Sequence, residues 1–107
     1  MAIIKKLNRR NGSSGEYVAL RYFWVDDLGR SARAYFELYS SKQAARDNPD
    51  APLIPIVAKV ALRDAEFDKR LGAKSKNPRD VFYKAMSDGV GVIADEGSTF
   101  YEDGTPA

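Results

Sequence analysis

Apolar and polar residues alternate most regularly over residues 16–40, and this pattern predicts one long β-hairpin. Its turn falls at residues 26–30, where Gly29 is best able to adopt the positive φ that closes a three-residue loop with a bulge. Pairing Asp26 with Arg30 fixes the register of the two strands. The pairs predicted to form a row of core residues are Trp24 with Ala32, Tyr22 with Ala34, Leu20 with Phe36 and Val18 with Leu38.

The other face of this hairpin is also rich in aromatic side chains. Aromatic residues mixed with arginine are typical of protein interfaces, so we expect this face to bind a partner. The expected partner-binding residues are Tyr17, Arg21, Phe23, Arg33, Tyr35 and Tyr39. A two-residue loop at residues 28–29 would place Arg21 against Phe36 in the apolar row, which argues against that register. The alternative for Tyr35 and Tyr39 is that a helix or the N-terminal strand covers them.

Three weaker patterns indicate further strands. Residues 2–7 alternate weakly, and a loop rich in glycine and serine follows them up to Gly15. Residues 53–62 form a strongly apolar run, in which Pro55 lacks a backbone donor and so predicts an edge strand or a start after Pro55. Residues 91–95 predict a last short strand.

Capping residues predict short helices between these strands. A helical turn over residues 42–46 can be capped by Ser40 or Ser41. Two further helices are predicted. The first has Asp64 as its N-cap and ends at Gly72, and the second, which is the clearer one, has Asn77 as its N-cap and ends at Gly89. We therefore expect one α+β domain over residues 1–107, with an antiparallel meander of about four strands and two short helices packed on one face.

The 107-residue chain contains no cysteine and no histidine. Their absence removes the thiol nucleophile, the commonest general base near neutral pH and the usual ligands of zinc, copper and iron. Gly89 and Gly91 follow a helix, whereas a dinucleotide-binding loop follows a strand, and Asp47 and Asp50 lack the further ligands of a calcium loop. We therefore expect no enzyme, no cofactor and no metal. No apolar run is long enough for a signal peptide or a membrane span.

The net charge is only +2, but the two ends of the chain differ in sign. The N-terminal end carries the basic residues Lys5, Lys6, Arg9 and Arg10. The C-terminal end carries the acidic residues Asp95, Glu96, Glu102 and Asp103. Either both ends are solvated, or oppositely charged termini meet within one chain or between copies. Residues 1–15 are expected to form a basic strand and loop, and residues 97–107 a loosely ordered acidic tail.

Residues 33–39 have some likeness to the aromatic strand of an RNA-recognition sheet, whose exposed rings stack on bases. The glycine of that motif is missing, however, and Glu37 would repel phosphate. The alternative function is a small nucleic-acid-binding module that uses arginine and tyrosine on the sheet face together with the basic N-terminus. Its candidate contacts are Arg21, Arg33 and Tyr35 on the sheet and Lys5, Lys6, Arg9 and Arg10 in the N-terminal segment.

Two segments resemble small phage and prophage proteins that are encoded among virion structural genes. In residues 35–46 an aromatic-x-Leu-Tyr strand runs into a short x-x-Ala-Arg helix, and the following loop ends in Pro-Leu at residues 52–53. The helix at residues 81–86 belongs to the same likeness. The resemblance implies a non-enzymatic structural or assembly protein, in the virion tail or the host cytoplasm. Such a protein would self-associate or bind another virion component, without a membrane.

Overall fold

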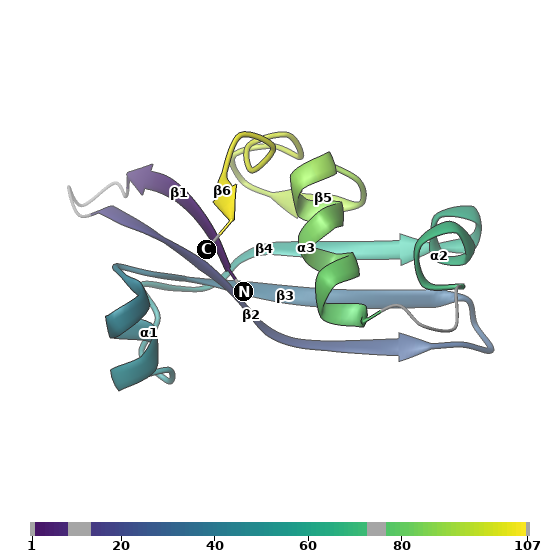
Figure 1. Ribbon diagram of the computed structural model, residues 1–107, viewed down its shortest axis with the longest axis horizontal. Coiled ribbons are helices and arrows are strands. Elements are labelled where there is room, and N and C mark those ends of the chain that lie inside the picture. The colour runs from purple at the N-terminus through teal and green to yellow at the C-terminus, as the bar shows by residue number, and fades with distance from the viewer. Residues whose placement is uncertain (1, 9–13, 73–76, 107) are drawn as a thin grey trace.

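The computed structural model describes residues 2–8, 14–72 and 77–106, which form six strands and three helices. The strands are β1 (Ala2–Asn8), β2 (Ser14–Asp26), β3 (Ser31–Tyr39), β4 (Ile54–Arg63), β5 (Val92–Ala94) and β6 (Thr105–Pro106). The helices are α1 (Lys42–Asp47), α2 (Asp64–Leu71) and α3 (Pro78–Asp88). The strands form one antiparallel sheet in the order β5-β4-β3-β2-β1-β6 (Figure 1).

The α+β class, the antiparallel strands and the helix over residues 42–46 are confirmed, whereas the predicted number of strands and the packing of the helices differ from the structure. The short strands β5 and β6 flank the four long strands, so the described part of the sheet has six strands instead of about four. A third helix, α1, contacts β3 and buries none of its residues. Ser41 caps it, because the Ser41 hydroxyl accepts a hydrogen bond from the Ala44 backbone N–H at 3.1 Å.

α3 lies across one face of the sheet, and α2 packs near the end of β4 (Figure 1). The predicted ends of α3 are confirmed: the Asn77 side chain accepts from the Arg79 backbone N–H at 3.0 Å, and Gly89 ends the helix with a φ of 69°. The core lies between the helices and this face of the sheet. Its fully buried side chains include Val18, Phe36, Leu38, Val60, Leu62, Phe82 and Met86.

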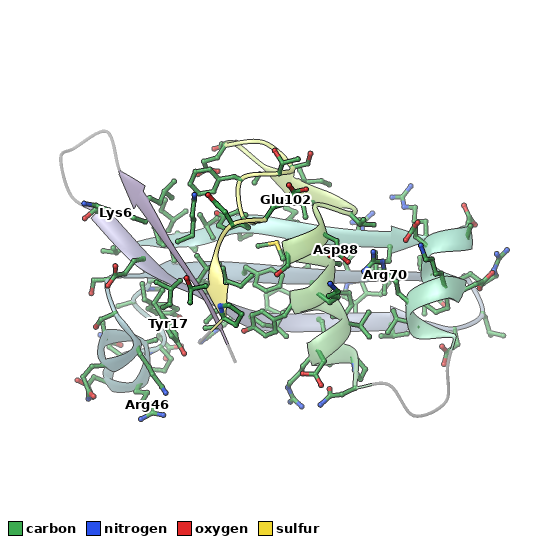
Figure 2. The ribbon with its side chains drawn as sticks, turned by 45° about the horizontal axis from the view of Figure 1, so that its top comes forward. Lys6, Tyr17, Arg46, Arg70, Asp88 and Glu102 are labelled. Atoms are coloured by element: carbon green, nitrogen blue, oxygen red, sulfur yellow. The ribbon has the colours of Figure 1, made fainter. Side chains whose placement is uncertain are left out.

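Arg70 joins the two helices that cover the core (Figure 2). Its guanidinium lies 3.1 Å from the Glu66 carboxylate within α2 and 3.1 Å from the Asp88 carboxylate of α3. Lys84, on the next turn of α3, lies 3.1 Å from the other oxygen of Asp88. These cations hold the pKa of Asp88 below its ordinary value, Lys84 having the larger effect.

A β-bulge at Arg21 changes which side chains of β2 face the core. The pairs before the bulge match the prediction, and they are Val18 with Leu38 and Leu20 with Phe36. The pairs after it are Tyr22 with Tyr35, Phe23 with Ala34, Trp24 with Arg33 and Val25 with Ala32. One extra residue moves every later side chain to the opposite face, because side chains alternate along a strand. Tyr22 and Trp24, predicted in the core, are therefore 52% and 43% exposed.

The hairpin turn also differs from the predicted three-residue loop. Asp26 pairs with Ser31, so four residues form the turn, and Arg30 rather than Gly29 adopts positive φ, at 51°. The Asp26 carboxylate accepts a hydrogen bond from the Gly29 backbone N–H at 2.9 Å. Arg30 donates two hydrogen bonds to the Asp68 carboxylate of α2, and this bidentate pair holds the turn against the helix.

The C-terminal segment contributes to the core instead of hanging from it as a loosely ordered acidic tail. Tyr101 is fully buried, and β6 pairs with β1. The Lys5 ammonium lies 2.7 Å from the Asp103 carboxylate, so a basic and an acidic residue of the two ends meet within one chain. The aromatic ring of Tyr101 supplies the apolar area that orders this segment, despite the acidic residues around it.

Candidate binding surface

The sheet face opposite α3 carries a group of exposed aromatic, cationic and aliphatic side chains. We call it the open face and define it by Tyr22, Trp24, Arg33, Tyr35, Lys59 and Ile93. The strand register places Tyr22, Tyr35, Lys59 and Ile93 in one row across β2, β3, β4 and β5. Because α2 and α3 pack on the other face, Ile93 is 60% exposed, and Tyr22 and Trp24 remain accessible.

Side chains of the open face pack on one another and form a continuous surface. The Tyr22 and Tyr35 rings stack with centroids 4.7 Å apart and planes inclined by 26°. The Arg33 guanidinium lies 5.8 Å from the centre of the Trp24 ring, and the Lys59 ammonium lies 5.9 Å from the centre of the Tyr35 ring. Such contacts limit the rotation of the rings before a partner binds, which lowers the entropic cost of binding.

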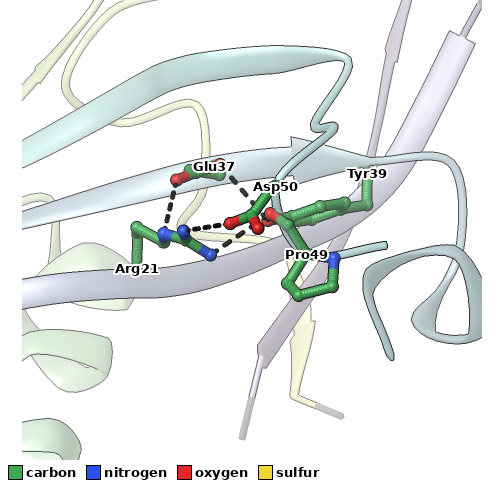
Figure 3. A network of polar contacts seen from close by, with 5 residues as sticks. All are labelled: Arg21, Glu37, Tyr39, Pro49 and Asp50. Carbon is green, nitrogen blue, oxygen red and sulfur yellow. Dashed lines mark hydrogen bonds and ion pairs between the residues drawn. The ribbon is translucent and has the colours of Figure 1, made fainter. Parts of the chain in front are cut away.

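A polar network covers the neighbouring part of the same hairpin, next to the bulge (Figure 3). The Arg21 guanidinium lies 3.2 Å from the Glu37 carboxylate and donates to the Asp50 carboxylate at 2.7 Å. The Tyr39 hydroxyl donates to the Pro49 carbonyl oxygen at 2.6 Å. These bonds hold the segment after α1 against β2 and β3, so Glu37 and Tyr39 are only 7% and 4% exposed.

The charges of this network stabilise its hydrogen bonds near neutral pH. The hydrogen bond to Asp50 raises the pKa of Arg21, and burial raises the pKa of Tyr39. Arg21 is therefore a cation and Tyr39 a neutral donor over the physiological range. A groove of about 230 Å³ adjoins the network, and it is lined by Tyr17, Ala19, Leu20, Arg21, Tyr39, Ala45, Arg46 and Pro49.

The structure divides the six residues predicted to bind a partner into three groups. Arg33 and Tyr35 lie on the open face. The groove beside α1 is lined by Tyr17, Arg21 and Tyr39. Tyr39 is buried there, which agrees with the alternative interpretation that other parts of the chain cover it. The bulge turns Phe23 toward α3, where its ring centre lies 5.5 Å from that of Phe82. Phe23 is therefore a core residue.

Four residues of the open face were missed by the sequence analysis. Tyr22 and Trp24 were assigned to the core because no residue type at position 21 signals a bulge. Lys59 and Ile93 belong to other strands, and only the strand order brings them beside the hairpin. The alternation in residues 53–62 does place Lys59 on the other face of the strand from its apolar neighbours, and this pattern indicates that Lys59 is exposed.

Lys5 and Lys6, the basic N-terminal residues that the structure describes, lie on β1, which is not one of the strands of the open face. The Lys5 ammonium, besides pairing with Asp103, lies 4.9 Å from the centre of the Phe100 ring. Lys6 is exposed. Arg9 and Arg10 lie outside the described residues. The described structure thus does not join these cations with Arg33 and Tyr35 into a single surface.

Across the described ranges, no three acidic residues lie close enough together to hold a metal ion. No helix in those ranges is both long and apolar enough to cross a membrane. Comparison of the chain with protein-family models, curated proteins and solved structures finds no match. The open face is therefore the feature from which a function can be argued.

Proposed function

We propose that this protein is a non-enzymatic structural or assembly protein that binds a partner protein through its open face. The observation that carries the proposal is the exposure of Tyr22, Trp24 and Ile93 on a sheet face that α2 and α3 leave uncovered. Large aromatic residues with an arginine among them are the usual anchors of protein interfaces. Stable interfaces bury about 800 Å² on each partner, and a surface spanning four strands offers an area of that order.

The resemblance to phage virion proteins supplies the biological setting of the proposal. In that setting the partner is a second copy of the chain or another virion component, and the protein acts in the host cytoplasm or in the particle. Cations and rings that already pack together favour such a contact, since few side chains need to be ordered on binding.

Co-expression with the products of neighbouring genes tests the proposal. The tagged wild-type protein should retain one of these products or a second copy of itself, and the Tyr35→Ala/Arg33→Glu variant should lose it at least tenfold. Ile56→Lys is the matched control, because Ile56 is 49% exposed but is not part of the open face. The proposal is wrong if the wild-type protein retains neither a neighbouring product nor a second copy, or if Ile56→Lys is as damaging as the double variant.

Single-stranded nucleic acid is the second candidate partner, favoured by the two cations that lie beside rings on the open face. Arg33 and Lys59 would contact phosphates while Trp24 and Tyr35 stack on bases. Binding of this kind weakens steeply with salt, because phosphate contacts release counterions. Titration of a single-stranded oligonucleotide at two salt concentrations tests this candidate. A steep loss of affinity at the higher salt concentration, and a smaller loss in the Lys59→Glu variant, would support it. Absence of binding at both concentrations would exclude it.

A further inference from the structure

β2 is longer than β1, the strand beside it, and its final residues pair on that side with no strand of the described residues. β1 pairs with β2 only from Ser14 to Ala19, whereas β3 pairs with the other edge of β2 as far as Asp26. At the end of the β1 contact, the Leu20 backbone N–H donates to the Tyr83 hydroxyl at 2.8 Å. In the part of the chain that the structure describes, no strand pairs with the outer edge of residues 22–26. We call these residues the free edge segment.

The free edge segment has few of the features that keep an edge strand from pairing. Proteins protect such edges with proline, with lysine or with inward-pointing charges. This segment has no proline, and its single charge, Asp26, lies at its end and accepts a hydrogen bond from Gly29. Its backbone is accompanied by exposed apolar area, since Trp24 and Val25 are 43% and 37% exposed. A strand of this kind is a template for another strand.

We propose that the free edge segment pairs antiparallel with the same segment of a second copy, centred on Trp24. This inference goes beyond the proposed binding through the open face, because it adds a contact between two copies of the chain through the edge of the sheet. A two-fold axis through the Trp24 pair joins the two sheets into one. The segment of five residues spans about 17 Å, so the contact is short and the dimer dissociates on dilution.

The register centred on Trp24 covers every exposed apolar side chain of the segment. On the open-face side, Trp24 lies opposite the second copy's Trp24, and Tyr22 lies opposite its Asp26. On the α3 side, Phe23 lies opposite the second copy's Val25. Aromatic and β-branched pairs of this kind stabilise neighbouring antiparallel strands.

Charge favours the antiparallel direction for a second copy. Asp26, the single charge of the segment, then lies opposite the second copy's Tyr22, and the two Asp26 carboxylates are about 14 Å apart along the strands. A parallel arrangement would instead place each Asp26 beside its own copy and repel. Arg21 takes no part in this contact, because Glu37 and Asp50 hold its guanidinium within one chain.

Residues 27–30 form the hairpin turn that follows the segment. Leu28 at the tip of this turn is 98% exposed and lies outside the strand pairing.

Disulfide crosslinking tests the register, because the natural chain has no cysteine. The Trp24→Cys variant should form a covalent dimer on mild oxidation, since opposed residues of neighbouring strands lie within the Cα separation of a disulfide. The matched control is Leu28→Cys, which is more exposed but lies about 27 Å from its own copy in this register. We expect at least tenfold faster crosslinking for Trp24→Cys. Equal rates, or a faster Leu28→Cys, overturn the register.

Two lysine variants separate the edge from the open face while leaving Trp24 in place. Sedimentation of the wild-type protein should show a mass that rises with concentration from 11.9 kDa toward twice that value. Val25→Lys should keep the protein monomeric at every concentration, and Ile93→Lys should leave the dimer unchanged. Dimer loss from Ile93→Lys alone overturns the edge pairing but supports assembly through the open face. A wild-type monomer throughout overturns the edge pairing, and co-expression then decides the proposed function separately.

Discussion

At the residue scale, two buried tyrosines show how much a single hydrogen bond matters in this core. The Tyr83 hydroxyl accepts a hydrogen bond from the Leu20 backbone N–H, whereas the Tyr101 hydroxyl is buried without a partner among the described residues. An unpaired buried hydroxyl lowers stability, and a paired one contributes modestly to it. The two side chains are otherwise similar, with Tyr83 7% and Tyr101 0% exposed.

We expect removal of these two hydroxyls to change stability in opposite directions. Tyr101→Phe should raise the free energy of unfolding by about 1 kcal/mol, because an unsatisfied polar atom leaves the core. Tyr83→Phe should lower it by about 1 kcal/mol, because the Leu20 N–H loses its acceptor. Urea denaturation of the three proteins measures both changes, and two variants that shift in the same direction would contradict this account.

Alkaline titration gives the same pair of variants a second readout. Burial raises the pKa of both Tyr83 and Tyr101 in the folded protein above the ordinary value of about 10. The resulting stability is complete below pH 10 and is lost as the pH rises further, because only the unfolded chain releases these protons readily. Tyr101→Phe should therefore lose stability less steeply above pH 10 than the wild-type protein does.

At the scale of elements, the ends of α3 were predictable from sequence, whereas the hairpin register and the start of α2 were not: Arg63 rather than Asp64 is the N-cap of α2, and no side chain caps it. α3 begins after Asn77 and ends at Gly89 as expected, because a helix cap depends on residues within one turn of the helix end. The bulge at Arg21 has no such local signal, and the acidic partners of its side chain, Glu37 and Asp50, come from other parts of the chain. The open face was therefore only one-third predicted: Arg33 and Tyr35 were identified, Tyr22 and Trp24 were placed in the core, and Lys59 and Ile93 were not assigned to it.

The two side-chain caps of the molecule provide a matched test of which helix supports the core. Asn77→Ala should lower the free energy of unfolding by about 1 kcal/mol, because five residues of α3 are buried. Ser41→Ala removes the same kind of bond from α1, whose residues are all at least partly exposed, and should leave global unfolding nearly unchanged. Thermal unfolding followed by circular dichroism checks both, and an equal loss in the two variants would contradict the distinction.

At the scale of the whole molecule, helices on one side and an uncovered sheet half on the other make the protein strongly two-sided. The sequence pattern indicated this two-sidedness, because both faces of the hairpin are rich in apolar residues. It did not indicate the closure of the fold by residues 97–106, since the acidic residues there conceal the single buried ring of Tyr101. The acidic composition describes the surface of that segment, whereas the buried Tyr101 ring, the pairing of β6 with β1 and the Lys5–Asp103 ion pair hold it against the rest of the fold.

Deletion of Arg21 tests whether the bulge decides which side chains of the hairpin tip face α3. Without the extra residue, regular alternation would turn Trp24 toward α3 and expose Phe23. Trp24 is the only tryptophan, so its emission should shift to the blue in the deletion variant. Arg21→Ala is the control, because it removes the ion pairs while keeping the residue count, and its emission should stay at the wild-type wavelength. An unshifted deletion variant that remains folded would contradict this role of the bulge.

One inserted or lost codon at position 21 is thus enough to exchange the inner and outer surfaces of the hairpin tip. No amino acid needs to be replaced for this exchange, because each side of the hairpin tip already carries aromatic residues: Tyr22 and Trp24 on one side and Phe23 on the other. If the open face binds a partner as proposed, a single genetic event of this kind would create or remove the binding surface, while the helices and the part of β2 before the bulge stay as they are.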